Sequence, residues 1–222
     1  EGRTWLPTAP NLQHPRGISR CSTPRCSSPQ IFHKSKLVPG AEMTPFSYIL
    51  KPFFDKFPMK IGGSIGNFGT NDSLQNFASF KGTFTPTICY ESIYGEYVSS
   101  FHSLGSNWIC IITNDGWWGN TFGHQQHQSY ARLRAIENRK YVIRSANTGI
   151  SSVINPMGKV EQLLPYGKEG IIESEITKHN RVTFYAKHGD YIGRLASFLG
   201  IIYLLQLILV ILKNNVTHLK NE

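Results

Sequence analysis

The sequence TFTPTICYE, residues 83–91, decides the fold of this chain. Its first six residues form a short run with high β propensity, and a helix-compatible stretch follows from Ser92 to Leu104. A strand that ends at Cys89 and continues into a helix places the thiol on a turn. Backbone N–H groups surround the sulfur there and can stabilise an anion. The pattern predicts a nucleophile at Cys89, and the alternative is a buried structural cysteine.

Hydrophobic periodicity divides the rest of the chain into alternating elements. Strands are predicted at residues 30–33, 83–88, 108–113, 141–145, 151–154, 160–164 and 170–176. Helices are predicted at 46–57, 92–104 and 125–140, with an ordered loop at 34–42, a glycine-rich loop at 62–69 and a turn at 155–158. Strands interleaved with helices predict an α/β fold, and 222 residues suffice for one sizeable core.

Charged residues near the cysteine are candidates for the same site. Glu91 follows the cysteine by two residues, and a carboxylate there is unfavourable beside a thiolate unless it is paired or transfers protons. A second candidate is the stretch KSKLVPGAE, residues 34–42. Held beside Cys89, the Lys34 ammonium would favour the thiolate and help to bind an oxyanion. The alternative is an ordinary solvated lysine.

The stretch NDGWWG, residues 114–119, follows a predicted buried strand. Loops at strand ends often carry function. Trp117 and Trp118 are adjacent and cannot both point inward, so at least one is expected to be exposed. Adjacent exposed tryptophans suit a lipid headgroup interface or a substrate groove. The alternative is a loop that packs over the core.

Histidine and arginine residues lie on the longest predicted soluble helix. His124 and His127 share a helix face, but no third metal ligand accompanies them, so surface histidines are favoured over a metal site. Four charged residues are typical of a solvated, salt-bridged face: Arg132, Arg134, Glu137 and Arg139. Gly149, in a turn between two strands, is free to take a positive φ.

The two ends of the chain differ from its middle. Residues 1–30 contain five prolines and no usable periodicity, so we expect an irregular leader. Residues 31–193 are expected to form one domain, residues 194–213 a transmembrane helix and residues 214–222 a polar tail.

The predicted transmembrane helix contains 18 consecutive uncharged residues, 195–212, which are mostly Leu, Ile and Val. At about 1.5 Å per residue this run is roughly 27 Å long, enough to cross the apolar core of a bilayer. The competing interpretation is a buried core helix, but the run shows no amphipathic periodicity. Arg194 and Lys213 flank it on both sides, so local charge does not fix its orientation.

The net charge of +9 is concentrated near the N-terminus, where residues 1–60 carry nine Lys or Arg and three acidic residues. A basic excess suits nucleic acid or an anionic membrane surface, and the absence of a nucleic-acid motif favours the membrane. Four cysteines in a chain of this length do not indicate a disulfide framework. Cys110 lies in a predicted buried strand, and Cys21 and Cys26 lack partners for a zinc site.

Together these stretches resemble the nitrilase-type carbon–nitrogen hydrolase superfamily, and within it the apolipoprotein N-acyltransferase family of bacterial membrane enzymes. The matching stretches are HKSKLVPGAE (33–42), PTICYE (86–91), NDGWWG (114–119), QH (126–127), ARLRAIE (131–137), RSANTG (144–149) and residues 185–190. The resemblance covers residue 31 to the C-terminus. A transmembrane helix after the catalytic domain fits this family and not the soluble amidases.

The resemblance implies a partial nitrilase-like αββα sandwich as the catalytic domain, over residues 31–193, followed by one C-terminal transmembrane helix. It implies an enzyme of the bacterial inner membrane with its catalytic domain on the periplasmic side. Cys89 would take a fatty acyl chain from a phospholipid as a thioester and pass it to the N-terminal amine of a diacylglyceryl lipoprotein. The family uses no metal or organic cofactor, and no nucleic acid is expected as a partner.

The resemblance also implies roles for single residues. Cys89, Lys34 and Glu91 would be catalytic, with the Lys34 ammonium and the backbone N–H of Tyr90 stabilising the tetrahedral oxyanion. Trp117 would lie on a loop that gates lipid entry. The residues expected to bind substrate or support the site are Glu42, Tyr90, Asn114, Trp117 and Trp118.

Two features of the family find no match in this sequence. The family's general-base glutamate and its multi-helix membrane domain both lie upstream of the lysine loop. We therefore expect this sequence to represent the C-terminal portion of the enzyme. General-base help is worth roughly 10²–10⁴ in rate, so an inactive fragment is one expected outcome. The alternatives are a membrane-anchored amidase of the same superfamily, which uses water in place of the amine, and a non-catalytic remnant.

Overall fold

The computed structural model describes residues 18–21, 30–39, 41–43, 70 and 73–220. These residues form a six-stranded sheet, a two-stranded sheet and a set of helices, so the predicted α/β class is confirmed. The helix predicted at 46–57 and the glycine-rich loop predicted at 62–69 lie outside the described residues.

The larger sheet has the strand order β3-β4-β5-β6-β7-β8. Its strands are β3 (Phe77–Ser79), β4 (Gly82–Ile88), β5 (Trp108–Thr113), β6 (Val142–Ala146), β7 (Ser151–Ile154) and β8 (Val160–Leu164). The three central strands, β4, β5 and β6, run parallel, and the outer pairs are antiparallel. Because the carboxyl ends of parallel strands meet at one edge, the residues that follow β4 and β5 lie side by side there.

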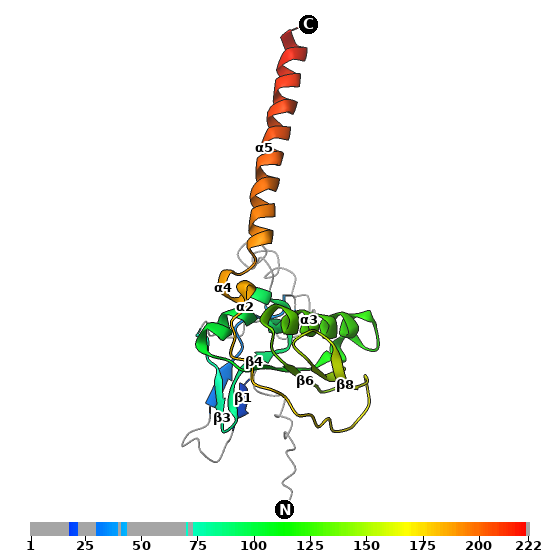
Figure 1. The fold of residues 1–222 in the computed structure, drawn as a ribbon. Coiled ribbons are helices and arrows are strands. Elements are labelled where there is room, and N and C mark those ends of the chain that lie inside the picture. The colour runs from blue at the N-terminus through cyan, green and yellow to red at the C-terminus, as the bar shows by residue number, and fades with distance from the viewer. Residues whose placement is uncertain (1–17, 22–29, 40, 44–69, 71–72, 221–222) are drawn as a thin grey trace, which may run out of the picture.

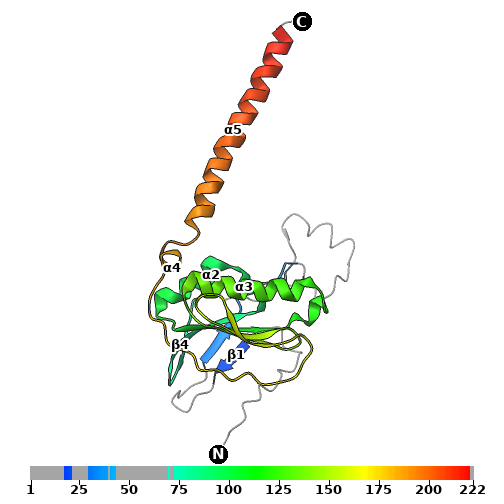
Figure 2. The ribbon, with the colours of Figure 1, turned by 45° about the vertical axis from the view of Figure 1, so that its right-hand side comes forward.

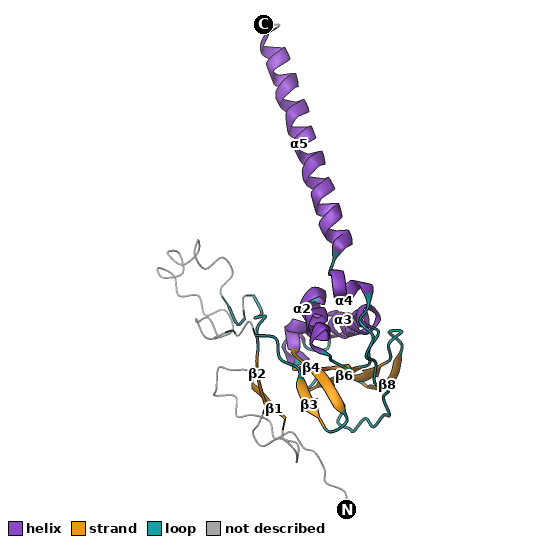
Figure 3. Cartoon of the chain, turned by 60° about the vertical axis from the view of Figure 1, so that its left-hand side comes forward, coloured by secondary structure: helices purple, strands orange, loops and turns teal. Residues whose placement is uncertain are grey.

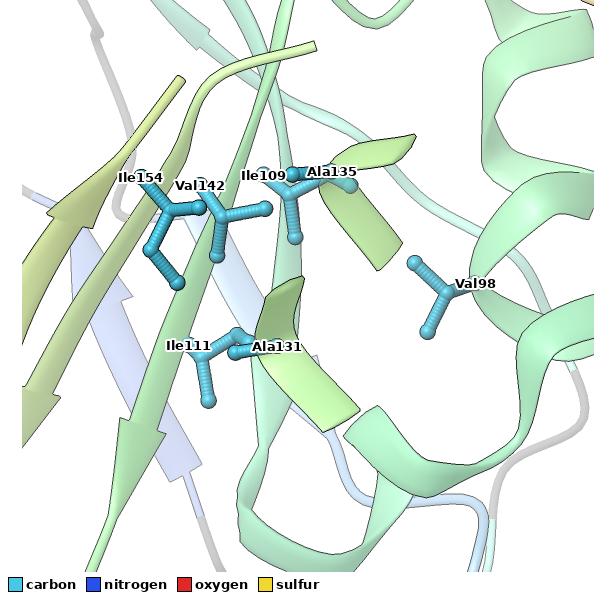
Figure 4. Close-up of a cluster of buried hydrophobic side chains, with 7 residues drawn as sticks. All are labelled: Val98, Ile109, Ile111, Ala131, Ala135, Val142 and Ile154. Atoms are coloured by element: carbon cyan, nitrogen blue, oxygen red, sulfur yellow. The ribbon is translucent and has the colours of Figure 1, made fainter. Parts of the chain in front are cut away.

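Two helices, α2 (Gly95–Ser100) and α3 (Phe122–Asn138), cover one face of this sheet (Figures 1 and 2). Side chains alternate along each strand, so every second residue of β5 points toward these helices. The resulting core consists of Val98, Ile109, Ile111, Ala131, Ala135, Val142 and Ile154 (Figure 4). The alanines of α3 allow the helix to lie close to the branched side chains of the sheet.

A second apolar cluster joins the smaller sheet to the body. The strands β1 (Ile18–Cys21) and β2 (Gln30–His33) pair antiparallel (Figure 3). Phe32 of β2 lies against Phe77 and Phe101, with ring centroids 6.4 and 6.1 Å away. The sequence predicted irregular structure throughout residues 1–30, and this is wrong for β1. Its pairing with β2 supplies hydrogen bonds that a four-residue stretch does not reveal by its own pattern.

The continuous helix predicted at 92–104 is also wrong. The stretch is divided into the 3-10 turn η1 (Cys89–Ile93), the helix α2 and a second 3-10 turn, η2 (Phe101–Leu104). Tyr94 interrupts the helix with an extended backbone, φ −86° and ψ 98°. The break lets the chain turn sharply after Cys89 before α2 settles on the sheet.

The strand predicted at 170–176 is absent, because this described stretch pairs with no neighbouring strand. Side chains hold the segment to the body instead. Gln162 of β8 donates a 2.6 Å hydrogen bond to the Glu173 carbonyl, and the buried Lys140 ammonium donates to the His179 carbonyl. The short strand β3 and the helix α4 (Phe184–His188) were not predicted.

The other predicted elements are confirmed, with small changes at their ends. The strands at 30–33, 83–88, 108–113, 151–154 and 160–164 are present, and β6 begins one residue later than predicted. Helix α3 begins earlier than predicted because the Thr121 hydroxyl accepts a hydrogen bond from the Gly123 N–H as an N-cap. It ends at Arg139, whose left-handed backbone (φ 51°) terminates the helix.

The last helix, α5 (Tyr191–Lys220), projects away from the body (Figures 1 and 2). Its segment Tyr191–Lys213 has a mean hydropathy of 2.6 and none of its apolar window is buried, so it is long and apolar enough to cross a membrane. Glu96 of α2 holds its base, accepting hydrogen bonds from the Arg194 guanidinium and, at 2.6 Å, from the Asp190 N–H.

Candidate functional site

Cys89 lies on the sharp turn between β4 and η1, with its side chain half-buried. Its backbone is left-handed, with φ of 51°, although cysteine carries a Cβ that disfavours this region. Such a conformation costs about 1–3 kcal/mol and persists only where the surroundings hold it. The predicted strand-to-helix turn is therefore present, and the residues that hold it become part of the site.

Two buried side chains hold the carbonyl group of this turn. The Ser92 hydroxyl donates a 2.7 Å hydrogen bond to the Cys89 carbonyl oxygen. Nε2 of His127, on α3, lies 2.9 Å from the Ser92 Oγ and 3.2 Å from the same carbonyl oxygen. Ser92 and His127 are only 1% and 2% exposed, so protein atoms rather than water surround this bridge.

Asp115, from the loop after β5, fixes the other side of the His127 ring. Its Oδ1 lies 2.9 Å from the His127 Nδ1 and accepts a 2.9 Å hydrogen bond from the Thr113 hydroxyl. Its Oδ2 accepts a 2.5 Å hydrogen bond from the Arg144 guanidinium on β6. Burial alone would raise the pKa of Asp115, but the His127 hydrogen bond and the Arg144 charge lower it to about 2.

These contacts correct two predictions about α3. His124 and His127 are both 2% exposed, not surface residues. Arg134 is also buried, and its guanidinium donates to the Ile93 carbonyl at 2.8 Å and to Glu137 at 2.7 Å. This part of the polar face of α3 is turned toward η1 and the sheet, which supply hydrogen-bond partners in place of water, whereas Arg132 and Arg139 are exposed as predicted. Among the described residues, no three His, Cys, Asp or Glu side chains form a metal site.

Gly149 has a different role from the one predicted. It does not have a positive φ. A Cβ atom at this position would lie 2.3 Å from the Asp115 Oδ2, closer than any real contact. The missing side chain therefore leaves room for the Asp115 carboxylate, and backbone freedom is not what this position requires.

Glu91 connects the cysteine turn to the lysine loop. Its carboxylate is fully buried and accepts hydrogen bonds from the N–H groups of Ser35 (2.6 Å), Lys36 (3.3 Å) and Ile88 (2.8 Å), and from the Tyr97 hydroxyl (3.2 Å). Burial raises the pKa of Glu91, although these backbone donors oppose the shift. With both oxygens engaged, the carboxylate fixes two segments against each other.

Lys34 is brought to this site as well, with 7% of its surface exposed. Its ammonium contacts both oxygens of Glu42, at 2.7 and 2.5 Å. Glu42 also accepts a 2.8 Å hydrogen bond from the Val38 N–H, which closes the loop on itself. The Lys34 charge lowers the pKa of Glu91 against the effect of burial. The N–H of the next residue, Ser35, donates to Glu91, which ties the lysine loop to the residue two positions after Cys89.

Of the remaining predicted residues, Tyr90 belongs to the cysteine turn and Asn114 to the loop after β5. The Tyr90 ring packs on Tyr94, with centroids 5.5 Å apart, and its N–H belongs to the first turn of η1, where backbone donors lack partners within the turn. Asn114 is exposed and caps the turn η3 (Asp115–Trp118) by accepting a 3.1 Å hydrogen bond from Gly116.

Both tryptophans of the loop reach solvent, which confirms that at least one is exposed. Trp117 is 74% exposed and Trp118 is 39% exposed. The Trp118 ring nevertheless meets the His127 ring edge-on, with centroids 5.2 Å apart. The exposed loop and the buried histidine are therefore in direct contact.

Residues missed by the sequence analysis form the buried half of this site: Ser92, Asp115, His127 and Arg144. Arg144 offered a signal, since a charged residue within an apolar strand needs a buried partner. Asp115, directly after a buried strand, offered another. Neither signal identifies His127 as the group that joins them to Cys89.

The carbon-nitrogen hydrolase family matches residues 22–183 of this chain. An apolipoprotein N-acyltransferase from Chlorobaculum tepidum is 32% identical over 188 residues, which cover 83% of this chain and 35% of that protein. One from Agrobacterium fabrum is 37% identical over 171 residues, or 76% of this chain and 32% of that protein. The chain thus spans about a third of the length of these curated relatives.

Two solved structures are distantly similar in fold. One is a glutamine-dependent NAD+ synthetase from Acinetobacter baumannii, with a TM-score of 0.46 and 14% identity, covering 64% of this chain and 24% of that chain. The other is a mutant of the amidase from Nesterenkonia sp. AN1, with a TM-score of 0.42 and 14% identity, covering 62% of this chain and 48% of that chain.

Proposed function

This chain belongs to the carbon–nitrogen hydrolase family, and we propose that it transfers a fatty acyl chain from a phospholipid to a lipoprotein through a thioester on Cys89. The observation that carries the proposal is the left-handed backbone of Cys89 on a turn that Ser92, His127 and Glu91 hold in place. The curated relatives named above, at 32% and 37% identity, support acyl transfer as the reaction.

In the first half-reaction the Cys89 sulfur attacks the ester carbonyl of the phospholipid. The new C–S bond forms as the ester C–O bond breaks, and the thiol proton passes to the departing lysophospholipid oxygen. The Lys34 ammonium and the backbone N–H of Tyr90 stabilise the tetrahedral oxyanion. During this step Glu91 keeps the lysine loop against the cysteine turn, and Glu42 holds the Lys34 ammonium within its loop.

In the second half-reaction the N-terminal amine of a diacylglyceryl lipoprotein attacks the thioester carbonyl. The C–N bond of the amide forms, the C–S bond breaks and a proton from the amine returns to the sulfur. Each half-reaction is an acyl transfer through a tetrahedral intermediate. The same oxyanion site therefore serves both steps, as is usual in covalent catalysis.

The lipid substrates place this reaction at a bilayer. Tyr191–Lys213 of α5 is proposed to span the bacterial inner membrane, with the domain on the periplasmic side. Trp117, Trp118 and Asn114 belong to a loop whose exposed indoles suit the headgroup region, where we place lipid entry.

The test uses the full-length protein in vesicles that contain a phospholipid with a radiolabelled acyl chain. The expected result is label on the protein that hydroxylamine releases, and its transfer to a lipopeptide with a free amine. Cys89→Ala should abolish the label, and Cys110→Ala, which removes another half-buried cysteine, should retain it.

Three outcomes contradict the proposal. Label that persists in Cys89→Ala excludes this residue as the nucleophile. Release of free fatty acid at the same rate with and without the lipopeptide indicates an amidase-type hydrolase. No label on the folded parent indicates a non-catalytic remnant.

A further inference from the structure

The orientation of the proposed nucleophile depends on the carbonyl group of Cys89, which buried side chains contact. Cys89 has a φ of 51°, and the carbonyl of this residue sets the direction in which the turn continues. That carbonyl oxygen lies within hydrogen-bond distance of the Ser92 hydroxyl (2.7 Å) and the His127 Nε2 (3.2 Å). Both groups are buried, with Ser92 1% and His127 2% exposed.

The protons around His127 follow from its partners. Asp115 accepts hydrogen bonds at both oxygens, from the Thr113 hydroxyl at Oδ1 and from Arg144 at Oδ2, so the carboxylate acts as an acceptor and the His127 Nδ1, 2.9 Å from Oδ1, donates to it. Arg144 Nη2, 3.2 Å from the same nitrogen, is a donor and therefore bonds to Asp115 instead. The ring is fixed in orientation, with Nε2 directed at the cysteine turn.

Two proton arrangements remain at Nε2. In one, Nε2 carries a proton and donates to the Ser92 Oγ and the Cys89 carbonyl, while Ser92 also donates to that carbonyl. In the other, the Ser92 hydroxyl donates to an unprotonated Nε2. The 2.7 Å hydrogen bond from the Ser92 hydroxyl to the Cys89 carbonyl selects the first arrangement, because in the second the one Ser92 proton goes to Nε2 and the carbonyl receives no donor from either side chain. In the first arrangement Ser92 and His127 act as a unit, joined by the 2.9 Å bond between them.

We propose that His127, oriented by Asp115 and bridged by Ser92, is a positioning residue that holds the Cys89 carbonyl and so keeps the sulfur in its reactive turn. This inference rests on Cys89 being the nucleophile of the proposed function. It assigns no proton transfer with substrate to His127. The unit is too deeply buried for that, since its Asp115, His127 and Ser92 are at most 2% exposed.

The test measures acylation of Cys89 by p-nitrophenyl acetate in the full-length protein in detergent. The thiolate displaces p-nitrophenolate, so the burst of released phenolate gives the acylation rate without any lipid or lipoprotein. His127→Phe keeps a ring but loses both nitrogens, and we expect the burst to slow by about ten- to a hundredfold. His127→Gln keeps an N–H near the carbonyl, and we expect its rate to stay within about threefold of the parent.

His124→Phe is the matched control, because His124 is on the same helix and equally buried but bonds to Asn120 and packs on Tyr166. It should lower the melting temperature as His127→Phe does and leave the burst rate unchanged. Ser92→Ala is the smaller change if His127→Phe does not fold. Ser92→Ala should slow the burst about tenfold. The double variant that combines Ser92→Ala with His127→Phe should be no slower than His127→Phe alone.

The outcomes separate this inference from the proposed function. A parent without a burst contradicts Cys89 as the nucleophile. A parent burst that His127→Phe or Ser92→Ala leaves unchanged overturns the positioning role alone. Equal losses in His127→Gln and His127→Phe, or fully multiplicative losses in the double variant, also overturn it, because they indicate packing rather than a held carbonyl.

Discussion

Glu91, two residues after the cysteine, accepts a 2.6 Å hydrogen bond from the backbone N–H of Ser35, 56 residues earlier in the chain. The same carboxylate accepts a hydrogen bond from the Ile88 N–H at the end of β4. One buried side chain therefore joins the loop that carries Lys34 to the turn that carries Cys89.

Glu91→Gln should separate these two segments. An amide places an NH2 group against backbone N–H donors, so at least one buried donor loses its acceptor, at a cost of about 1–3 kcal/mol. We expect a lower melting temperature and faster hydrogen exchange at Ser35 and Lys36. Glu161→Gln, at an exposed residue that accepts a 3.1 Å surface hydrogen bond from Asn155, is the control and should change neither. Unchanged exchange at Ser35 would contradict the linking role.

Gly149→Ala should disturb the buried half of the site. The new Cβ would lie 2.3 Å from the Asp115 Oδ2, so the carboxylate must move away from Arg144 and His127. Overpacking of this kind costs about 1–3 kcal/mol, and we expect a slower p-nitrophenyl acetate burst as well. Gly200→Ala, in α5 where nothing lies within 4 Å of the new atom, should preserve both stability and burst rate. A variant as stable and reactive as the parent would refute the close packing.

Lys140 gives the free energy of unfolding a distinctive pH dependence. Burial lowers its pKa from 10.5 to about 8, so between these values the unfolded chain binds the proton that the folded chain has released. Lys140 lowers the free energy of unfolding at pH 8. This destabilising effect shrinks as the pH rises to 10.5, so the free energy of unfolding increases by up to about 3 kcal/mol.

Lys140→Met removes this titration. The free energy of unfolding of the parent, minus that of the variant, should increase steadily across this pH range in denaturant titrations. Lys159→Met, at a solvent-exposed lysine, is the control for the lysine-to-methionine change itself. A parent-minus-variant difference for Lys140 that is flat from pH 8 to 10.5 would contradict the lowered pKa.

Trp117→Ala should affect the reaction with lipid and not the fold. The side chain is 74% exposed, so its loss should change stability by no more than about 0.5 kcal/mol. We expect thioester formation from vesicle phospholipid to fall about tenfold, because an interfacial anchor is lost. The burst with soluble p-nitrophenyl acetate should stay the same. Met157→Ala removes an equally exposed apolar side chain (76%) from the turn between β7 and β8 and should alter neither reaction.

The sequence was sufficient for the features that depend on local pattern. The strands at 83–88 and 108–113, the turn at Cys89 and the long apolar helix near the C-terminus were all predicted from short stretches. Each depends on β propensity, on apolar runs or on an element boundary, and these signals lie within about ten to twenty residues. The expectation that Lys34 lies beside the cysteine came from the family resemblance.

The tertiary structure decided which side chains are buried and which partners they have. The His127 ring is buried because it lies on the side of α3 that faces η1. There it contacts Asp115, which follows β5, and the carbonyl of Cys89, 38 residues earlier in the chain. The periodicity of α3 could not reveal this orientation, since a polar stripe looks the same whether it faces water or a buried carboxylate. Burial of a polar group is stable only when distant elements supply its hydrogen bonds, and a single stretch of sequence does not contain them.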